Sequence, residues 1–270
     1  DENLIEVDTK FIDLEKSIDC GKNTIREYDN KIPKDLTAEE ILIRSGNIGS
    51  VRIGQKIGIE KFKYFLTKIN LINKIEFDID EIGIPIPFKW GKCKLATTSF
   101  GHGVTTTPLQ LAKGYAIVTN GGFDVNPTII KEKSEKLIKY KKRIIKENVS
   151  KKINPILRKI VASKEGTANL ADVKGYEIGG KTGTAEKIVS GTYSNQKKIN
   201  TFASVFPISN PKFVLLVILD EPKINTEYIY NYRDGSNFKL KGSPRNTAGW
   251  TSVEATGHIV EKIGPILATK

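Results

Sequence analysis

The chain of 270 residues contains no methionine and only two each of cysteine, histidine and tryptophan. The low numbers of cysteine and histidine limit the kinds of site that the protein can have. Cys20 and Cys93 are too few for a disulfide framework, and their spacing fits no metal site. The two thiols can pair in an oxidising compartment, but we expect both to be buried and free. His102 and His258 have no clustered ligands around them in the sequence, so we expect no metal and no cofactor.

Long apolar runs are missing as well. No run approaches the roughly 18 residues that a membrane-spanning helix needs, and the longest, 213–219 (FVLLVIL), has the length of a strand. The first residues show no signal peptide. Because there is also no initiator methionine, we interpret the chain as a piece of a longer protein whose membrane anchor would lie upstream of Asp1.

Positive charge is plentiful, since 43 lysines and arginines against 31 acidic residues give a formal net charge of +12. The basic residues are scattered along the chain. The densest stretch, 136–146 (KLIKYKKRIIK), has one aromatic residue and matches no recognisable nucleic-acid module. We therefore expect no nucleic-acid partner.

Helical signals dominate the first part of the chain. Thr37 followed by Glu40 forms a capping box at the start of a helical region, 36–58, which breaks at Ser45-Gly46-Asn47 and then resumes. We also expect helices at 62–72, at 105–122 with Pro108 at its start, and at 151–163 with Pro155 near its first turn, and we expect a loop around Pro85 and Pro87 and a hairpin over 126–146.

The second part of the chain changes character. Three segments, 175–187, 199–208 and 212–222, have the pattern of strands, and a short turn signal at 209–211 joins the last two. So short a connection forces antiparallel pairing, because a parallel crossover needs about a dozen residues or more. An amphipathic helix over 251–268 follows. The fold class is therefore α+β.

Residues 175–184 (GYEIGGKTGT) fit two motifs with different chemistry. From Gly175 they fit G-x-x-x-x-G-K-[ST], the phosphate loop of nucleotide hydrolases, and Asp220 could then hold magnesium. From Lys181 they read K-T-G-T, the third motif of penicillin-binding serine acyltransferases. A phosphate loop follows a buried strand and opens a helix in a parallel sheet, and the surrounding sequence predicts none of these. The nucleotide-binding alternative would show magnesium-dependent ATP binding that Lys181→Ala abolishes.

Other segments match the acyltransferase interpretation in order and spacing. They are Ser45-Gly46-Asn47 within 44–58 (RSGNIGSVRIGQKIG), 97–122 (TTSFGHGVTTTPLQLAKGYAIVTNGG), 165–168 (EGTA), 175–187 (GYEIGGKTGTAEK), 209–222 (SNPKFVLLVILDEP) and 247–250 (TAGW). Through them the chain resembles the transpeptidase domain of class B penicillin-binding proteins, especially the division-specific septal enzyme.

This resemblance implies a penicillin-binding, β-lactamase-like transpeptidase fold in which helices pack an antiparallel sheet, here truncated at its N-terminus. Residues 1–270 would then be the C-terminal portion of a single transpeptidase domain. Its helical part would cover about 1–165, and its sheet strands and C-terminal helix about 170–270.

The resemblance also implies catalytic roles for three residues. Ser45 would relay a proton between the catalytic base and the leaving amine, and Asn47 would hydrogen-bond the peptide amide of the substrate. Lys181 would supply positive potential and tune Ser45. Taken alone, each residue also fits an ordinary structural role in a helix break, a cap or a solvated strand.

Substrate binding would fall to the rest of the K-T-G-T segment. Thr182 and Thr184 would hold the terminal carboxylate of the substrate, or that of a β-lactam. The backbone N–H of Thr184 would be one oxyanion donor. Gly180 and Gly183 would keep the strand open to substrate.

The nucleophile of the family, the Ser of an S-x-x-K motif at the start of a buried helix, is expected just upstream of Asp1. Three S-x-x-K matches exist in the chain, beginning at Ser194, Ser209 and Ser236. None begins a hydrophobic helix that would present Ser and Lys on one face. The chain alone is therefore expected not to acylate.

For the intact protein, the resemblance implies a serine-type D-Ala-D-Ala transpeptidase that cross-links peptidoglycan stem peptides in septal cell-wall synthesis during cell division. Its partners would be stem peptides, β-lactam antibiotics and division-machinery proteins. An N-terminal anchor outside this chain would hold it on the periplasmic face of the bacterial inner membrane. A non-catalytic, penicillin-recognising sensor or scaffold on the same fold is the main alternative.

Overall fold

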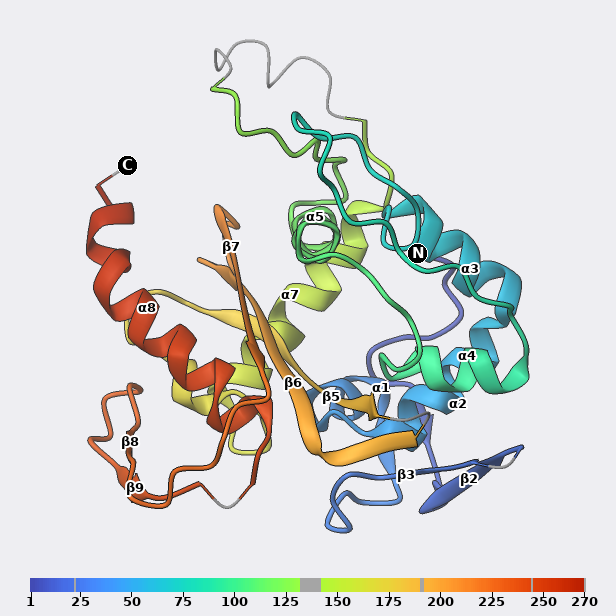
Figure 1. The fold of residues 1–270 in the computed structure, drawn as a ribbon, viewed down its shortest axis with the longest axis horizontal. Helices are drawn as coiled ribbons and strands as arrows, with labels where there is room; N and C mark the ends of the chain where they lie inside the picture. Colours follow the sequence, from blue (N-terminus) through green and yellow to red (C-terminus); the bar gives the residue numbers. More distant parts are fainter. Residues whose placement is uncertain (22, 132–141, 190–191, 244, 270) are drawn as a thin grey trace. The chain divides into compact units, whose positions relative to one another are not determined.

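The computed structural model describes residues 1–21, 23–131, 142–189, 192–243 and 245–269 (Figure 1). They fall into two compact units, residues 1–153 and 154–270. Each unit has buried apolar side chains of its own, such as Ile48 and Ile117 in the first and Phe202 and Val253 in the second. The assignment of the whole chain to one transpeptidase domain stays a prediction.

In the first unit, short strands lead into a series of helices. β1 pairs with β4 and β2 with β3, both antiparallel. The elements are β1 (Lys10–Phe11), β2 (Ser17–Cys20), β3 (Asn23–Arg26), β4 (Leu36–Thr37), α1 (Ala38–Arg44), α2 (Asn47–Ile57), α3 (Ile59–Lys68), α4 (Lys92–Ser99) and α5 (Pro108–Thr119). The helix-rich first part is thereby confirmed, whereas the sequence did not predict α4 or the hairpin of β2 and β3.

Capping boxes set the starts of two helices. The Thr37 hydroxyl accepts a hydrogen bond from the Glu40 N–H at 3.2 Å, and the Glu40 carboxylate accepts one from the Thr37 N–H at 2.7 Å, as predicted. Thr107 and Gln110 form a second capping box at α5, which the sequence analysis did not identify. Pro108 occupies the first turn of α5, where its missing N–H leaves no bond unmade.

Helices α1 and α2 pack so closely that only glycine fits between them. A Cβ on Gly49 would lie 2.6 Å from the Cγ1 atom of the buried Ile41. This approach fixes the corner at Ser45, where the two helices meet. Around the corner lies an apolar cluster of buried residues, namely Leu14, Ile25, Ile32, Leu36, Ile41, Ile48, Val51 and Ala96.

Cys20 and Cys93 form a disulfide with a Cα–Cα distance of 5.3 Å, so the expectation of two buried free thiols is wrong. The disulfide joins the end of β2 to the first turn of α4. Cys93 is exposed and Cys20 is half-buried. Neither element was expected from the sequence, so nothing there indicated that two cysteines 73 positions apart come together.

Helix α7 (Glu147–Ala162) runs from the first unit into the second and begins before the predicted residue 151. Pro155 therefore lies inside the helix, and its placement near the first turn was wrong. Glu147 forms ion pairs with Arg143 and Lys151, each at 2.7 Å, and an acidic side chain is favourable at a helix N-terminus. The centre of the predicted hairpin over 126–146, residues 132–141, lies outside the described residues.

The second unit is built on an antiparallel sheet of β5 (Gly179–Val189), β6 (Thr192–Phe206) and β7 (Phe213–Asp220), in the order β5-β6-β7. The predicted antiparallel pairing across the 209–211 turn is confirmed. Helix α8 (Ser252–Leu267) packs against β6 and β7 (Figure 1). The remaining elements are η1 (Asn169–Ala171), β8 (Ile229–Asn231), β9 (Lys239–Lys241) and η2 (Ala248–Trp250).

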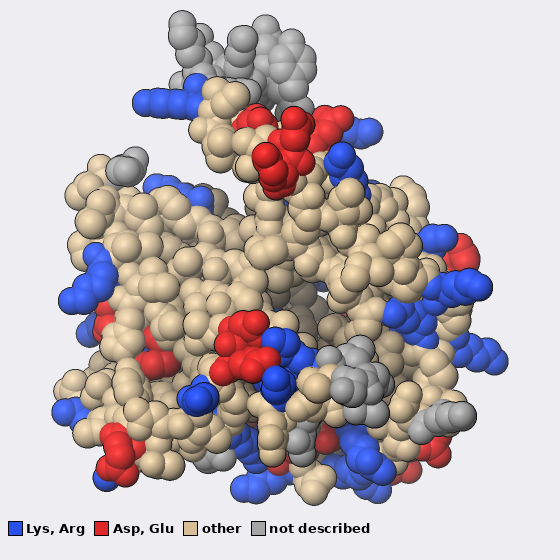
Figure 2. All heavy atoms as spheres, viewed as in Figure 1, with Lys and Arg blue, Asp and Glu red and all other residues tan. Residues whose placement is uncertain are grey.

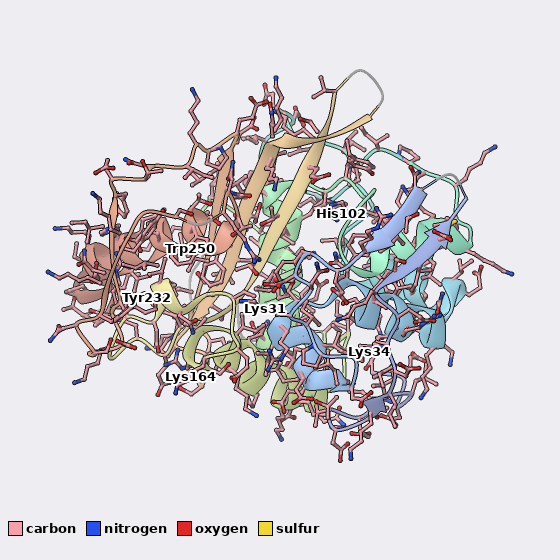
Figure 3. All side chains as sticks on the ribbon, turned by 90° about the horizontal axis from the view of Figure 1, so that it is seen from below. Lys31, Lys34, His102, Lys164, Tyr232 and Trp250 are labelled. Atoms are coloured by element: carbon pink, nitrogen blue, oxygen red, sulfur yellow. A yellow bond between two sulfur atoms is a disulfide. The ribbon has the colours of Figure 1, made fainter. Side chains whose placement is uncertain are left out.

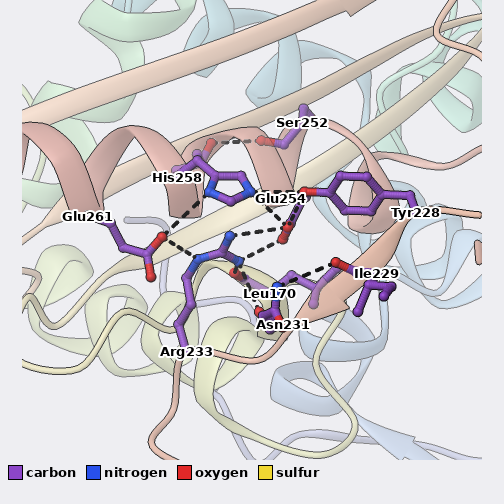
Figure 4. Close-up of polar contacts among 10 residues, drawn as sticks. Leu170, Tyr228, Ile229, Asn231, Arg233, Ser252, Glu254, His258 and Glu261 are labelled. Carbon is purple, nitrogen blue, oxygen red and sulfur yellow. Dashed lines mark hydrogen bonds and ion pairs between the residues drawn. The ribbon is translucent and has the colours of Figure 1, made fainter. Parts of the chain in front are cut away.

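A polar cluster ties the segment after β8 to α8 and η1 (Figure 4). The buried guanidinium of Arg233 lies 2.6 Å from the buried carboxylate of Glu254 and donates to the Leu170 carbonyl at 2.6 Å. The Tyr228 hydroxyl donates to Glu254 at 2.9 Å. Each buried charge thus has a partner of opposite charge and further hydrogen bonds, which buried ions require.

Basic and acidic side chains are intermingled on the face of the protein in Figure 2. Lysines and arginines occur at many places on it, with aspartates and glutamates between them. Among the described residues, no helix is both long and apolar enough to cross a bilayer.

Candidate active site

Ser45 and Asn47, the predicted S-x-N motif, lie in the first unit at the corner between α1 and α2. Ser45 ends α1 in the left-handed conformation, with φ 58° and ψ 40°. Gly46 then caps α2, and its N–H donates back to the Ile41 carbonyl at 2.9 Å. The predicted break in the helical pattern is confirmed, and it presents Ser45 at a sharp turn.

The carboxylate of Glu27 caps α2 from outside the helix. Its two oxygens accept hydrogen bonds from the N–H groups of Asn47 and Ile48 at 2.8 and 2.9 Å. A carboxylate at this position satisfies free N–H groups and interacts favourably with the helix dipole. Glu27 therefore fixes the backbone of the S-x-N motif.

The side chain of Asn47 is held by the strand next to the corner. Its Nδ2 donates to the carbonyl of Arg26, the last residue of β3, at 2.9 Å. An asparagine amide has two N–H donors and one carbonyl acceptor. The contact with Arg26 uses one of the two N–H donors and fixes the orientation of the Asn47 amide. The side-chain carbonyl and the second N–H can then hydrogen-bond a peptide ligand.

The K-T-G-T segment lies in the second unit, within β5, which is the first strand of the sheet. Alternate residues of a strand point to opposite faces, so Thr182 and Thr184 share one face and Lys181 and Gly183 the other. No helix begins after this segment, as a phosphate loop requires. Asp220, the predicted magnesium ligand of that interpretation, instead pairs with Lys187 at 3.0 Å, and Glu221 pairs with the same lysine at 2.8 Å. The phosphate-loop interpretation is therefore wrong.

Lys181 is unusual for a strand lysine because its side chain is half-buried rather than exposed. Burial lowers the pKa of Lys181 from 10.5 to about 8, since a charged ammonium loses solvation there. Its Nζ donates to the Thr182 carbonyl at 3.0 Å. At neutral pH the amine is therefore mostly a cation, and it loses its proton only slightly above neutral pH. Such a group suits a site that transfers protons and binds anions.

Both threonine hydroxyls of the segment contact residues distant in sequence. The hydroxyls of Thr182 and Thr167 lie 2.7 Å apart. The Thr184 hydroxyl accepts a hydrogen bond from the Ala248 N–H at 3.0 Å. Thr167 and Ala248 belong to the EGTA and TAGW segments, which the sequence analysis used for the resemblance without giving either a role.

Trp250, labelled in Figure 3, is the last residue of the TAGW segment. It ends η2, and its ring packs edge-on against Tyr230 with centroids 5.1 Å apart. His102, which we did not assign to the site, lies in the loop after α4, where its ring contacts Phe100 at 4.8 Å between centroids (Figure 3).

The two glycines of the segment have different surroundings. A Cβ on Gly180 would lie 2.5 Å from the Ala203 carbonyl oxygen and 2.8 Å from the Phe202 ring, so close packing with β6 requires glycine. At Gly183 the nearest atom would lie 3.9 Å away, and the residue is exposed. Packing in the free protein therefore does not require glycine at position 183. The predicted role of Gly183, keeping β5 open to a ligand, remains the reason for a glycine there.

This contrast predicts separate effects for two substitutions. Gly180→Ala should lower the free energy of unfolding by about 1–3 kcal/mol through overpacking. Gly183→Val should change stability by less than about 0.5 kcal/mol and yet lower penicillin binding by blocking close approach to β5. Urea unfolding and penicillin labelling of both variants in the full-length protein check this, and normal labelling of Gly183→Val would contradict it.

None of the three S-x-x-K matches lies at the start of a helix. Ser194 is within β6, Ser209 is in the turn before β7, and Ser236 precedes β9. Within the described ranges, no group of three or more His, Cys, Asp or Glu side chains could hold a metal. The S-x-N residues thus lie in the first unit and the K-T-G-T residues in the second, and none of the three S-x-x-K matches has the helical setting expected for the nucleophile.

Comparison with known proteins agrees with these motifs. Residues 1–237 match the family model described as the penicillin binding protein transpeptidase domain. The chain is 30% identical over 266 residues to the probable peptidoglycan D,D-transpeptidase FtsI of Caulobacter vibrioides, covering 96% of the chain and 42% of that protein. It is 36% identical over 196 residues to the stage V sporulation protein D of Bacillus subtilis, covering 68% of the chain and 30% of that protein.

Solved structures show the same fold. The apo transpeptidase domain of penicillin-binding protein 3 from Burkholderia pseudomallei has a TM-score of 0.79 at 23% identity, covering 97% of this chain and 73% of that chain. Penicillin-binding protein 3 from Mycobacterium tuberculosis, complexed with aztreonam, has a TM-score of 0.77 at 23% identity, covering 97% and 59%. The predicted α+β fold with an antiparallel sheet is confirmed, and the chain spans less than half the length of the two curated relatives.

Proposed function

Since the chain belongs to the penicillin-binding protein transpeptidase family, we propose that it supplies the substrate-binding and proton-handling part of a peptidoglycan D,D-transpeptidase. The observation that carries the proposal is the arrangement on β5. A half-buried lysine of lowered pKa is followed by two threonines whose hydroxyls are held on one face by Thr167 and Ala248. A cation and paired hydroxyls suit a peptide that ends in a carboxylate.

The reaction would proceed in two acyl transfers. A serine hydroxyl attacks the carbonyl of the penultimate D-Ala of a stem peptide, forms an ester, and expels the terminal D-Ala, whose amine takes up a proton. An amine from a neighbouring stem then attacks the ester, forms the cross-linking amide and restores the serine. A β-lactam would acylate the same serine.

The residues of this chain would divide the work. Ser45 relays the proton to the leaving amine, and Asn47 hydrogen-bonds the peptide backbone of the substrate. Lys181 supplies the positive potential near the reacting groups. Thr182 and Thr184 hold the terminal carboxylate.

The nucleophilic serine and its lysine would come from a part of the protein outside this chain. Two observations support this: none of the three S-x-x-K matches begins a helix, and the chain covers less than half of the two curated relatives named above. The chain by itself would then bind a penicillin without forming a covalent bond.

We place the intact protein at the septum of a dividing bacterium, facing the periplasm and held in the inner membrane by an anchor outside this chain. The similarity to an FtsI protein supports the division role. The Cys20–Cys93 disulfide supports an oxidising compartment such as the periplasm. Division-machinery proteins would be its partners there.

Release of D-alanine from a pentapeptide donor tests the proposal. The full-length protein should release one D-alanine per molecule on acylation and more once an amine acceptor or water cleaves the acyl-enzyme, and penicillin should stop the release. Acylation by penicillin without any D-alanine release would favour the sensor or scaffold alternative. Absence of both reactions would contradict the proposal.

A further inference from the structure

Asn200 is a fully buried polar residue in β6, directly opposite Thr184 of β5. Its Nδ2 donates to the Asn246 Oδ1 and to the Thr251 Oγ1, both at 2.9 Å. Both contacts cross about fifty residues of sequence and end on one short segment, 246–251. Asn200 thus connects the middle of the sheet to the segment that contains η2.

The 246–251 segment is held by contacts at both ends, and close packing restricts its backbone between them. Asn246, the first residue of the segment, also donates to the Pro222 carbonyl at 2.6 Å. This bond holds the start of the segment to the chain just after β7. In the middle, a Cβ on Gly249 would lie 2.8 Å from the Thr167 carbonyl oxygen, so the backbone packs directly on its neighbour. The position of the Ala248 N–H is therefore set by these contacts.

The Ala248 N–H determines in which direction the Thr184 hydroxyl can donate a hydrogen bond. It donates to the Thr184 Oγ1 at 3.0 Å and occupies one of the lone pairs of the hydroxyl. A threonine hydroxyl has a single hydrogen, and this hydrogen must then point away from the Ala248 N–H. The hydroxyl is thereby oriented as a donor, which is what a carboxylate ligand needs.

We propose that Asn200 is a positioning residue for Thr184, which it orients as a carboxylate donor by holding the 246–251 segment in place. The inference rests on the proposed function, because it assigns the carboxylate of the substrate to Thr184. Stability alone does not account for an asparagine here. Its Oδ1 is buried without a hydrogen-bond partner in the described part of the chain, and an apolar side chain would avoid that desolvation cost.

The test compares the rate constants of acylation by benzylpenicillin and by its methyl ester, in the full-length protein. The ester lacks the carboxylate, so the ratio of the two rate constants measures recognition of that group. Asn200→Leu should lower the acid-to-ester ratio about tenfold, as expected for a misplaced hydrogen bond to a charged group. A residue with a merely structural role would lower both rate constants together.

Ser204→Ala is the matched control. Ser204 is fully buried on the same face of β6, and its hydroxyl donates to the Leu215 carbonyl of β7 at 3.0 Å. The control should keep the acid-to-ester ratio of the unmodified protein. If Asn200→Leu does not fold, Asn246→Ala, at a half-buried position, removes one of the two contacts of Asn200 with the segment and should lower the ratio in the same direction.

The outcomes separate this inference from the proposed function. An unmodified protein that neither penicillin nor its ester acylates would overturn the proposed function and this inference with it. An unmodified protein that prefers the acid, together with Asn200→Leu and Asn246→Ala variants that keep the preference, would overturn the role of Asn200 alone.

Discussion

Lys181→Met should lower the rate constant of acylation by penicillin about a hundredfold to a thousandfold in the full-length protein, as loss of a preorganised electrostatic group does in other enzymes. Methionine keeps most of the length of the lysine side chain and removes the charge. Because the Lys181 side chain is half-buried and its ammonium is partly desolvated, water screens its charge less than at the surface. Stopped-flow or quenched measurement of penicillin acylation gives the rate constant directly.

The pH dependence of the same reaction gives a second readout. The pKa of Lys181 is lowered to about 8, so its cationic form is lost as pH rises through that value. Acylation of the unmodified protein should therefore fall above about pH 8, and Lys181→Met should not show this fall. The unfolded chain holds the proton more tightly, with a pKa near 10.5, so the cost of burying this charge is relieved and the fold gains stability as pH rises from about 8 to 10.5.

Activity and the stability contribution of Lys181 thus change in opposite directions with pH, which separates loss of charge from unfolding. Lys187→Met is the matched control, since Lys187 lies on the same strand and pairs with Asp220 and Glu221 at the surface. It should keep the acylation rate and its pH profile. A Lys181→Met variant that acylates within a factor of about three of the unmodified protein would contradict the role given to the charge.

Reduction of the Cys20–Cys93 disulfide should lower the free energy of unfolding of the first unit by about 4 kcal/mol, because the bond closes a long loop in the unfolded chain. The cysteines are 73 positions apart. The hairpin that contains Cys20 leads into Arg26 and Glu27, which hold Asn47 and the start of α2. Amide hydrogen exchange at Asn47 and Ile48 should therefore also become faster on reduction.

Denaturant unfolding of the single and double cysteine variants tests this prediction. Cys20→Ser, Cys93→Ser and the double variant should all lose about the same stability, since each removes the same bond. A reductant should affect the unmodified protein and leave the double variant unchanged. Two titratable thiols in the non-reduced protein would contradict the disulfide.

Local signals in the sequence predicted the elements that carry the site. The capping box of Thr37 and Glu40 depends on residues three positions apart, and the antiparallel sheet depends on the short turn at 209–211. The break at Ser45 follows from two helical patterns that glycine and asparagine interrupt. Such features are set by neighbouring residues, so one sequence is enough to find them.

Contacts between distant segments could not be predicted in this way. Glu27 caps α2 from twenty residues upstream, and Ala248 reaches Thr184 across 64 residues. Helix α4, which is short and rich in threonine, has no clear apolar face, and without it Cys93 had no predicted neighbour. These contacts arise from tertiary packing, which the pattern of one segment does not contain.

The position of the acyl group tests the central claim most directly. After reaction of the full-length protein with benzylpenicillin, proteolysis and mass spectrometry of the peptides locate the modified residue. The account predicts one adduct, on the serine of an S-x-x-K sequence that precedes Asp1, and none on Ser45, Ser194, Ser209 or Ser236. An adduct on any of these four serines, or no adduct at all, would contradict it.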